Sequence, residues 1–179
     1  MNTQIRALRE ADAAAYQLIR RRALIEHPEA FSGELAEFER RSPAEIAAML
    51  ATPSAWRCTF GAYVRDDLVG LAAYGRPDND KLRHRAGLYQ MYVAPEYRGM
   101  GLGQDLVEAV IDHASRQAGL EELYLNVTIG NLRAELLYRR CGFEPRFVDS
   151  RYMKIGDKYH DVLWMGYTLH PFEGEGKSR

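Results

Sequence analysis

The stretch MYVAPEYRGMGLGQ, residues 91–104, decides the fold, because it joins an apolar strand-like run to the start of an amphipathic helix. Its three alternate glycines, Gly99, Gly101 and Gly103, let the main chain curl tightly, so that successive N–H groups point into one concavity. Such a concavity binds anions, and the helix that follows adds the partial positive charge of its N-terminus. Arg98 places a fixed positive charge beside it. The stretch therefore predicts a seat for a pyrophosphate.

Spacing excludes two other glycine loops that bind phosphate. A dinucleotide-binding fingerprint needs two residues before its last glycine and an acidic residue closing the next strand. Here one residue separates Gly101 from Gly103, and the next strand contains the apolar and amide residues LNV at 125–127. A P-loop needs Gly-Lys followed by Ser or Thr, whereas Gln104 follows Gly103. A plain strand-to-helix turn would also explain two of the three glycines, so the flanking sequence has to decide.

That flanking sequence predicts a mixed α/β layer with a central sheet. We expect strands, in chain order, at residues 5–8, 56–64, 68–74, 82–93, 123–128, 146–155 and 158–169, the last two joined by a hairpin turn at Gly156-Asp157. We expect helices from residue 12 to Pro28, after Ser42-Pro43, at 102–118 and at 131–140. Two of them carry apolar stripes, Ala15, Leu18, Ile19 and Ile25 in the first and Leu102, Leu106, Val110, Ala114 and Ala118 in the third, which Gly119 is predicted to cap.

Two separated motifs resemble those of the GNAT superfamily of N-acetyltransferases. Arg98, Gly101 and Gly103 match that family's acetyl-CoA loop, Arg/Gln-x-x-Gly-x-Gly/Ala, and residues 91–96 resemble its pantetheine-binding strand. Residues 131–143, NLRAELLYRRCGF, resemble its second cofactor motif. The resemblance follows the element order from 5 to 169, with its specific residues between 89 and 143. A narrower likeness at 28–31, 81–84, 151–154 and 159–161 is to a small bacterial-type subgroup whose acceptors are mostly undefined.

The resemblance implies one GNAT domain over residues 1–170, followed by a disordered tail at 171–179. It implies a central, mostly antiparallel, twisted sheet with helices on both faces, in which the parallel strands 89–93 and 123–128 splay apart to admit the pantetheine arm. Acetyl-CoA would be the co-substrate, and its acetyl group would pass directly to a primary amine in a ternary complex. The residues implied to bind acetyl-CoA are Met91, Tyr92, Val93, Arg98, Gly99, Met100, Gly101, Leu102, Gly103, Gln104, Asn131 and Tyr138.

Tyr138 is the residue that the resemblance makes catalytic. A phenol, with an ordinary pKa of about 10, can hand a proton to a departing thiolate, whose thiol has a pKa of about 8.5. Its alternative role is a core tyrosine beside Leu137. Asn131 matches the residue that contacts the pantetheine arm, or it caps the helix that starts there. A main-chain amide of residues 91–93 is expected to polarise the thioester carbonyl.

The general base is left open. Many GNAT enzymes place a glutamate on the strand before the loop, yet residues 88–93 contain no acid. The candidates are a water relay, Tyr89, Glu34 in the 28–50 segment, which we interpret as a lid, or Asp161 in the last hairpin. For each side chain, an ordinary surface or turn role is the favoured alternative.

Composition excludes several other classes of protein. With 179 residues, 46% of them hydrophobic, the chain suits one core, and its 24 basic and 25 acidic residues leave no overall field for nucleic acid. No apolar run has the length of a signal peptide or a membrane span. We therefore expect a cytoplasmic protein, a monomer or homodimer, whose partners are acetyl-CoA and a small-molecule or protein amine.

Other reactive side chains receive structural interpretations. Cys58 and Cys141 fit neither a disulfide framework nor a zinc site, and Cys141 is interpreted as a packed residue. We expect no metal, because the histidines have no partners at ligand spacing. Residues 20–22, RRR, could meet an anionic group, but a solvated helix face is the favoured interpretation. Two rival functions remain, a GNAT fold that binds acyl-CoA without turnover and a nucleotide-binding domain that does not use CoA.

Overall fold

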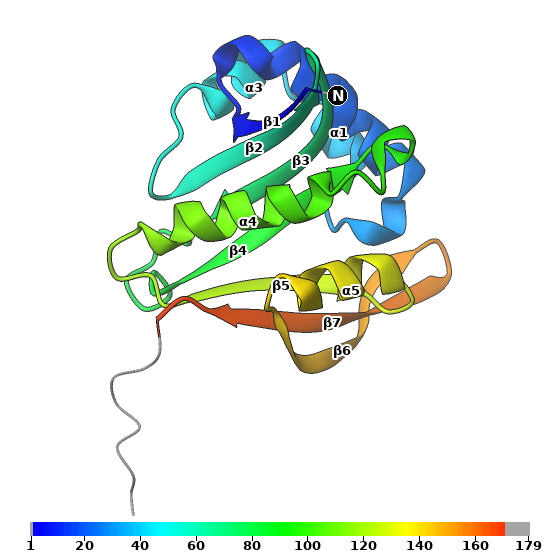
Figure 1. Ribbon diagram of the computed structural model, residues 1–179. Helices are drawn as coiled ribbons and strands as arrows, with labels where there is room; N and C mark the ends of the chain where they lie inside the picture. Colours follow the sequence, from blue (N-terminus) through cyan, green and yellow to red (C-terminus); the bar gives the residue numbers. More distant parts are fainter. Residues whose placement is uncertain (1, 171–179) are drawn as a thin grey trace, which may run out of the picture.

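Seven strands form one sheet in the order β1-β2-β3-β4-β5-β7-β6 in the computed structural model, which describes residues 2–170 (Figure 1). The tail predicted at 171–179 lies outside the described residues. The strands are β1 (Thr3–Ala7), β2 (Arg57–Val64), β3 (Asp67–Gly75), β4 (Arg85–Val93), β5 (Glu122–Thr128), β6 (Glu144–Ile155) and β7 (Lys158–Thr168). All seven predicted strands are present, and most of their ends lie within three residues of the predicted positions.

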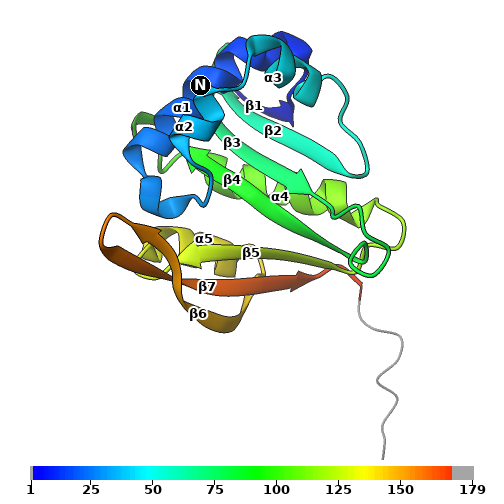
Figure 2. The same cartoon turned by 180° about the vertical axis from the view of Figure 1, so that it is seen from behind.

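The sheet is antiparallel everywhere except between β4 and β5. These two strands pair in parallel over only three residues each, from Arg85 opposite Glu122 to Gly87 opposite Tyr124. Beyond that point β4 remains with β3 and β5 remains with β7, so the two halves of the sheet diverge (Figure 2). The predicted splayed pair is confirmed.

Helices cover both faces of this sheet. They are α1 (Ala13–Glu26), α2 (Leu35–Glu39), α3 (Pro43–Leu50), α4 (Leu102–Ser115) and α5 (Leu132–Arg140), with short 3-10 turns η1 (Glu10–Asp12), η2 (Pro28–Ala30) and η3 (Pro95–Tyr97). Figure 1 shows α4 and α5 on the near face, and Figure 2 shows α1 and α2 on the opposite one. None of the helices between residues 2 and 170 has the length and apolar composition that crossing a membrane requires.

Two helix predictions need correction. The stripe of α4 is buried from Leu102 to Ala114, but the helix ends at Ser115 and Ala118 is exposed. The chain turns earlier than predicted because the N–H of Gln117 bonds back to Ala114 and the next turn brings Leu120 into the core. Gly119, with φ of +67°, belongs to that turn and does not cap the helix.

In α1 the buried face differs from the predicted stripe. Leu18 and Ile25 are 73% and 48% exposed, and of the predicted apolar positions only Ile19 is buried. The buried face instead consists of Tyr16, Ile19, Arg20, Ala23 and Leu24. The prediction went wrong because two of these side chains, Tyr16 and Arg20, carry polar ends that hide a helical spacing of three and four residues.

A polar cluster fixes the start of α1 to the sheet. The Asp12 carboxylate accepts hydrogen bonds at 2.7 and 2.8 Å from Arg6 of β1, at 2.9 Å from the Tyr63 hydroxyl of β2 and at 2.8 Å from the Arg9 N–H. The Arg6 guanidinium holds the pKa of Asp12 well below its usual range. At the other end of α1, the Tyr92 hydroxyl donates to Glu26 at 2.6 Å. The helix is thus held at both ends.

Candidate active site

The loop before α4 presents unused main-chain donors. Gly99 and Gly101 have φ of +83° and +84°, which an L side chain rarely adopts. Within the described part of the chain, the N–H groups of residues 99–103 donate no hydrogen bond, because the first helical bonds of α4 come from Gln104 and Asp105. These N–H groups belong to the loop and to the first two residues of α4, a helix N-terminus, and such groups suit phosphate oxygens.

Gly103 brings the first turn of α4 close to its neighbours. A Cβ built on Gly103 would lie 3.3 Å from Leu137 Cδ2 of α5 and 3.5 Å from Met91 Cε of β4. A larger residue would crowd both contacts, since few real Cβ atoms approach a neighbour as closely as 3.3 Å. The loop is therefore held against α5 and the end of β4.

Arg98 is tied to the end of β4. Its Nε donates to the Val93 carbonyl at 2.9 Å, and its Nη2 lies 3.1 Å from the Nε2 of His27. These contacts place the guanidinium beside the loop, where the sequence analysis expects a positive charge.

A bulge shapes β4 where it leaves β5. Tyr89 pairs with Ala73 and Tyr92 with Leu71, so Gln90 and Met91 together face a single residue of β3. Gln90 has φ of +56°, and its side-chain oxygen accepts a hydrogen bond from the Tyr16 hydroxyl of α1 at 3.0 Å. Bulges leave an unpaired residue and bend their strand, which contributes to the separation of β4 from β5.

The residues predicted to bind acetyl-CoA point in several directions. Met91 and Val93 pack toward the core that underlies α4, whereas Tyr92 packs on the α1 side. Leu102 is 1% exposed, and the Gln104 amide is bonded to Glu108 at 2.7 Å. The side chains of Tyr92 and Leu102 are buried away from the loop surface, so a role of these two residues in cofactor binding falls to their main chain.

Tyr138 lies on α5 at the gap between β4 and β5. It is 6% exposed, and its ring packs edge-on against Phe143 at 6.0 Å. Within residues 2–170 its hydroxyl has no hydrogen-bond partner, although the residue borders a cleft. Burial raises the pKa of Tyr138 well above its usual range, so the phenol keeps its proton. The hydroxyl is therefore available as a hydrogen-bond donor.

The cleft, of about 470 Å³, lies between the two halves of the sheet. Met91 and Tyr138 border it on one side, and Tyr16, Arg20 and residues 30–34 border it on the other. Its floor includes side chains of β5 and β7, namely Tyr124, Asn126 and Trp164. The Thr128 hydroxyl donates to the carbonyl of Glu29 at 2.6 Å and so fastens η2 to the end of β5. The 28–50 segment therefore covers the open side of the splay in part.

The structure separates the three candidate bases. Glu34 and Tyr89 border the cleft, and Asp161 does not. Asp161 instead accepts the N–H of Arg151 at 2.7 Å, inside the β6-β7 hairpin. For Tyr89, desolvation of the hydroxyl and a 2.8 Å hydrogen bond to Tyr124 raise the pKa well above its usual range. A Tyr89 phenolate is therefore scarce at neutral pH.

Arg20 differs from the favoured interpretation of residues 20–22 as a solvated helix face. Arg21 and Arg22 are ion-paired at the surface, at 2.7 Å to Glu39 and 2.7 Å to Glu26, as a solvated helix face requires. Arg20 is only 7% exposed and borders the cleft, so the prediction was wrong for this residue. Arg20 lies four residues after Tyr16 and four before Leu24, which places all three on one face of the helix. This spacing could have indicated that Arg20 is buried.

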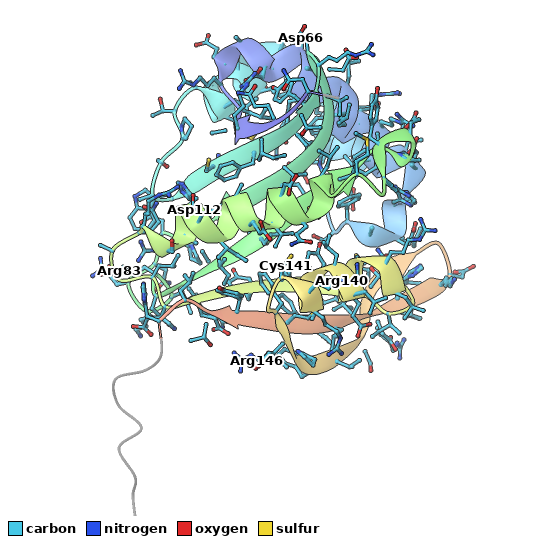
Figure 3. All side chains as sticks on the ribbon, viewed as in Figure 1. Asp66, Arg83, Asp112, Arg140, Cys141 and Arg146 are labelled. Carbon is cyan, nitrogen blue, oxygen red and sulfur yellow. The ribbon has the colours of Figure 1, made fainter. Side chains whose placement is uncertain are left out.

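The other candidates have structural contacts. The Asn131 side chain accepts the Ala134 N–H at 3.3 Å, which makes it the cap of α5. Cys141 follows α5 (labelled in Figure 3), and burial raises the pKa of its thiol to about 11. Within residues 2–170 no three His, Cys, Asp or Glu side chains gather as metal ligands would.

Comparison with known proteins decides the family. The model of the acetyltransferase (GNAT) family matches residues 14–143, which is most of the chain. The chain belongs to the GNAT family of acetyltransferases. Its GNAT motifs therefore coincide with the open N–H groups of residues 99–103 and with the splay of β4 from β5.

Individual GNAT proteins resemble the chain in sequence or in fold. The spermine/spermidine N(1)-acetyltransferase of Bacillus subtilis (strain 168) is 34% identical over 87 residues, 47% of this chain and 57% of that protein. The chain thus matches little more than half the length of this relative. A GNAT acetyltransferase of Streptococcus pneumoniae shares the fold with a TM-score of 0.85, at 24% identity over 94% of this chain and 100% of that one. The yncA protein of Salmonella typhimurium, solved with its cofactor acetyl-CoA, has a TM-score of 0.77, at 23% identity over 95% of each chain.

Proposed function

We propose that this protein transfers the acetyl group of acetyl-CoA to a primary amine by direct attack in a ternary complex. The observation that carries the proposal is a single gap in the sheet. The bulge of β4 and the unpartnered hydroxyl of Tyr138 border this gap. The unpaired N–H groups of residues 99–103 lie next to it, since Gly103 packs against Met91 of β4 and Leu137 of α5. An amine can reach the same gap through the cleft beneath α1.

The residues present fit acetyl-CoA. The N–H groups of residues 99–103 and the N-terminus of α4 would hold the pyrophosphate, with Arg98 beside them. The pantetheine arm would lie along Met91 to Val93, where β4 has no partner on the β5 side. Asn131, whose side-chain oxygen is engaged in capping α5, would contact the arm with its remaining hydrogen-bonding groups.

One bond forms and one breaks in the proposed reaction. The neutral amine attacks the thioester carbonyl carbon and forms the C–N bond, and the C–S bond breaks as the sulfur leaves as a thiolate. A main-chain N–H of residues 91–93 would polarise the carbonyl oxygen. Tyr138, which keeps its proton because of its raised pKa, would protonate the sulfur. The proton lost by the amine would leave through the cleft to solvent.

A second function has one observation in its favour. Residues 88–93 carry no carboxylate, and both acids that border the cleft, Glu34 and Glu37, are exposed. A domain that binds acyl-CoA as a sensor, without turnover, needs no base. The two functions differ in whether free thiol is ever released.

The test is thiol release from acetyl-CoA by the purified protein across classes of amine. The panel includes amino acids, aminoglycosides, peptides with free N-termini, and spermidine, because one relative is named for polyamines. Thiol release that depends on one amine class supports the transferase. Calorimetric binding of acetyl-CoA without release for any amine would support the sensor, and failure to bind acetyl-CoA would reject both.

A further inference from the structure

The side chain of Arg20 is almost entirely buried and has no hydrogen-bond or ion-pair partner among the described residues. Arg20 is 7% exposed, and among residues 2–170 none of its five N–H donors makes a hydrogen bond or an ion pair. Its Nη1 is fully buried. Arginine is almost never buried in this state, because a charge taken out of water without compensation is costly.

The surroundings of Arg20 offer packing without neutralisation. The guanidinium lies over the Phe31 ring at 4.5 Å, and a Cβ at Gly33 would lie 3.3 Å from its Nη2. Residues 31–33 therefore wrap around the charged group and leave it room. The acids on this side are Glu37, which is 3.4 Å from Arg41, and Glu34, which forms no ion pair with Arg20.

A second buried donor borders the same cleft. The indole Nε1 of Trp164 in β7 is buried and has no acceptor among the described residues. The Tyr16 hydroxyl, by contrast, is already bonded to Gln90. Besides the Tyr138 hydroxyl, the cleft between α1 and β7 thus has two buried donors without a partner among the described residues, Arg20 Nη1 and Trp164 Nε1. The carboxylates that border it, Glu34 and Glu37, are exposed and bond to neither.

We infer that the acceptor amine carries a carboxylate, and that Arg20 binds this carboxylate inside the cleft. The inference rests on the proposed function and names the substrate class of that site. An unpaired arginine fork fits the two oxygens of one carboxylate, and Arg41 is already paired with Glu37. The amine end would then point across the cleft to Met91 and Tyr138, and the carboxylate end toward α1. A polyamine would bring only positive charge to Arg20.

The first experiment compares amines that differ only in the carboxylate. Thiol release from acetyl-CoA is measured for a panel of L-amino acids, for the corresponding carboxamides and decarboxylated amines, and for spermidine. We expect at least one amino acid to exceed its carboxamide in kcat/KM by roughly tenfold to a hundredfold, the range of a hydrogen bond to a charged group. Equal rates within every pair, or a preference for spermidine, would overturn the inference while leaving acetyl transfer intact.

The second experiment removes the charge. Arg20→Met should abolish the preference for the amino acid over its carboxamide, because kcat/KM falls much more for the amino acid than for the carboxamide. Arg21→Met is the matched control. Arg21 is the next residue on α1, but its side chain is 54% exposed and ion-paired with Glu39 outside the cleft. The control should retain the full preference.

Stability separates recognition from a structural role. Since Arg20→Met removes an unpaired buried charge, the melting temperature should be maintained or rise. If Arg20 instead holds the lid by pairing with Glu34 or Glu37 in solution, the variant should melt lower and lose activity equally with all acceptors. That result would overturn the inference.

A binding measurement applies even if no amine is turned over. N-acetylated L-amino acids and their carboxamides are titrated calorimetrically into the protein saturated with CoA. Tighter binding of a carboxylate form, lost in Arg20→Met, supports the inference for a sensor as well as for an enzyme. Absence of any difference between the two forms contradicts it.

Discussion

Under the proposed function, the two sides of the gap between β4 and β5, here called the cofactor wall and the acceptor wall, would recognise their ligands by different means. The cofactor wall consists of the end of β4, residues 94–103 and the start of α4, with α5 beside them, and it offers main-chain N–H groups. The acceptor wall consists of α1 and residues 28–41, and it offers side chains such as Tyr16, Arg20 and Glu34. Main-chain recognition requires glycines at fixed positions and so leaves a pattern in the sequence. Side-chain recognition leaves none, because any element can supply the group.

The largest expected effect is on the cofactor wall. Gly101→Val should weaken acetyl-CoA binding by roughly a hundredfold or more, the loss of about two hydrogen bonds to charged oxygens. Valine is strained at φ of +84°, so the loop must change its conformation and its N–H groups must turn. Calorimetric titration with acetyl-CoA measures the effect.

Gly156→Val is the control for this change. Gly156, in the β6-β7 turn, also has a positive φ, of +57°, and no atom near its missing Cβ. It should suffer a similar backbone strain with unchanged affinity for acetyl-CoA. Normal affinity in Gly101→Val would show that the loop is not the phosphate seat.

The next effect concerns Tyr138, which stands where the two walls meet. Tyr138→Phe should lower the rate of acetyl transfer by roughly a hundredfold, the contribution of a general acid, with near-normal affinity for acetyl-CoA. Tyr74→Phe is the matched control, because Tyr74 is also buried but its hydroxyl bonds to the Ala55 carbonyl away from the cleft. Parallel losses of binding and rate in Tyr138→Phe would instead identify a structural tyrosine.

The contrast between the walls also explains what could be predicted from the sequence. The loop followed from glycine spacing, because local backbone geometry fixes it. The splay of β4 from β5 and the interpretation of Tyr138 came from the resemblance of two motifs to the GNAT family. The start of α3 after Ser42-Pro43 was likewise local and was predicted, and the structure shows Ser42 and Glu45 capping it.

The acceptor wall depended on contacts between distant segments. Arg20 was assigned to the surface because a run of three arginines usually faces water, and only the packing of α1 against β3 and residues 31–33 buries it. The short helix α2 was missed for the same reason, since its Phe38 is ordered by packing against Tyr16. Asp161 was considered as a base because its hydrogen bond from the Arg151 N–H depends on the register of β6 and β7. That register cannot be inferred from the sequence of either strand alone.

The smallest effects are expected for the bases, on the acceptor wall. We predict that Glu34→Gln and Tyr89→Phe each lower acetyl transfer by less than about tenfold, because a water path to solvent shares the proton among several groups. The acid limb of the pH profile should follow the pKa of the acceptor amine itself, since only the neutral amine attacks. Tyr89→Phe should leave this limb unchanged, because the raised pKa of Tyr89 keeps it protonated throughout the neutral range.

Asp161→Asn, outside the cleft, serves as the control and should affect the stability of the hairpin rather than the rate. If Glu34→Gln removed nearly all activity together with the acid limb, Glu34 would be the base. The acceptor wall would then supply catalysis as well as recognition.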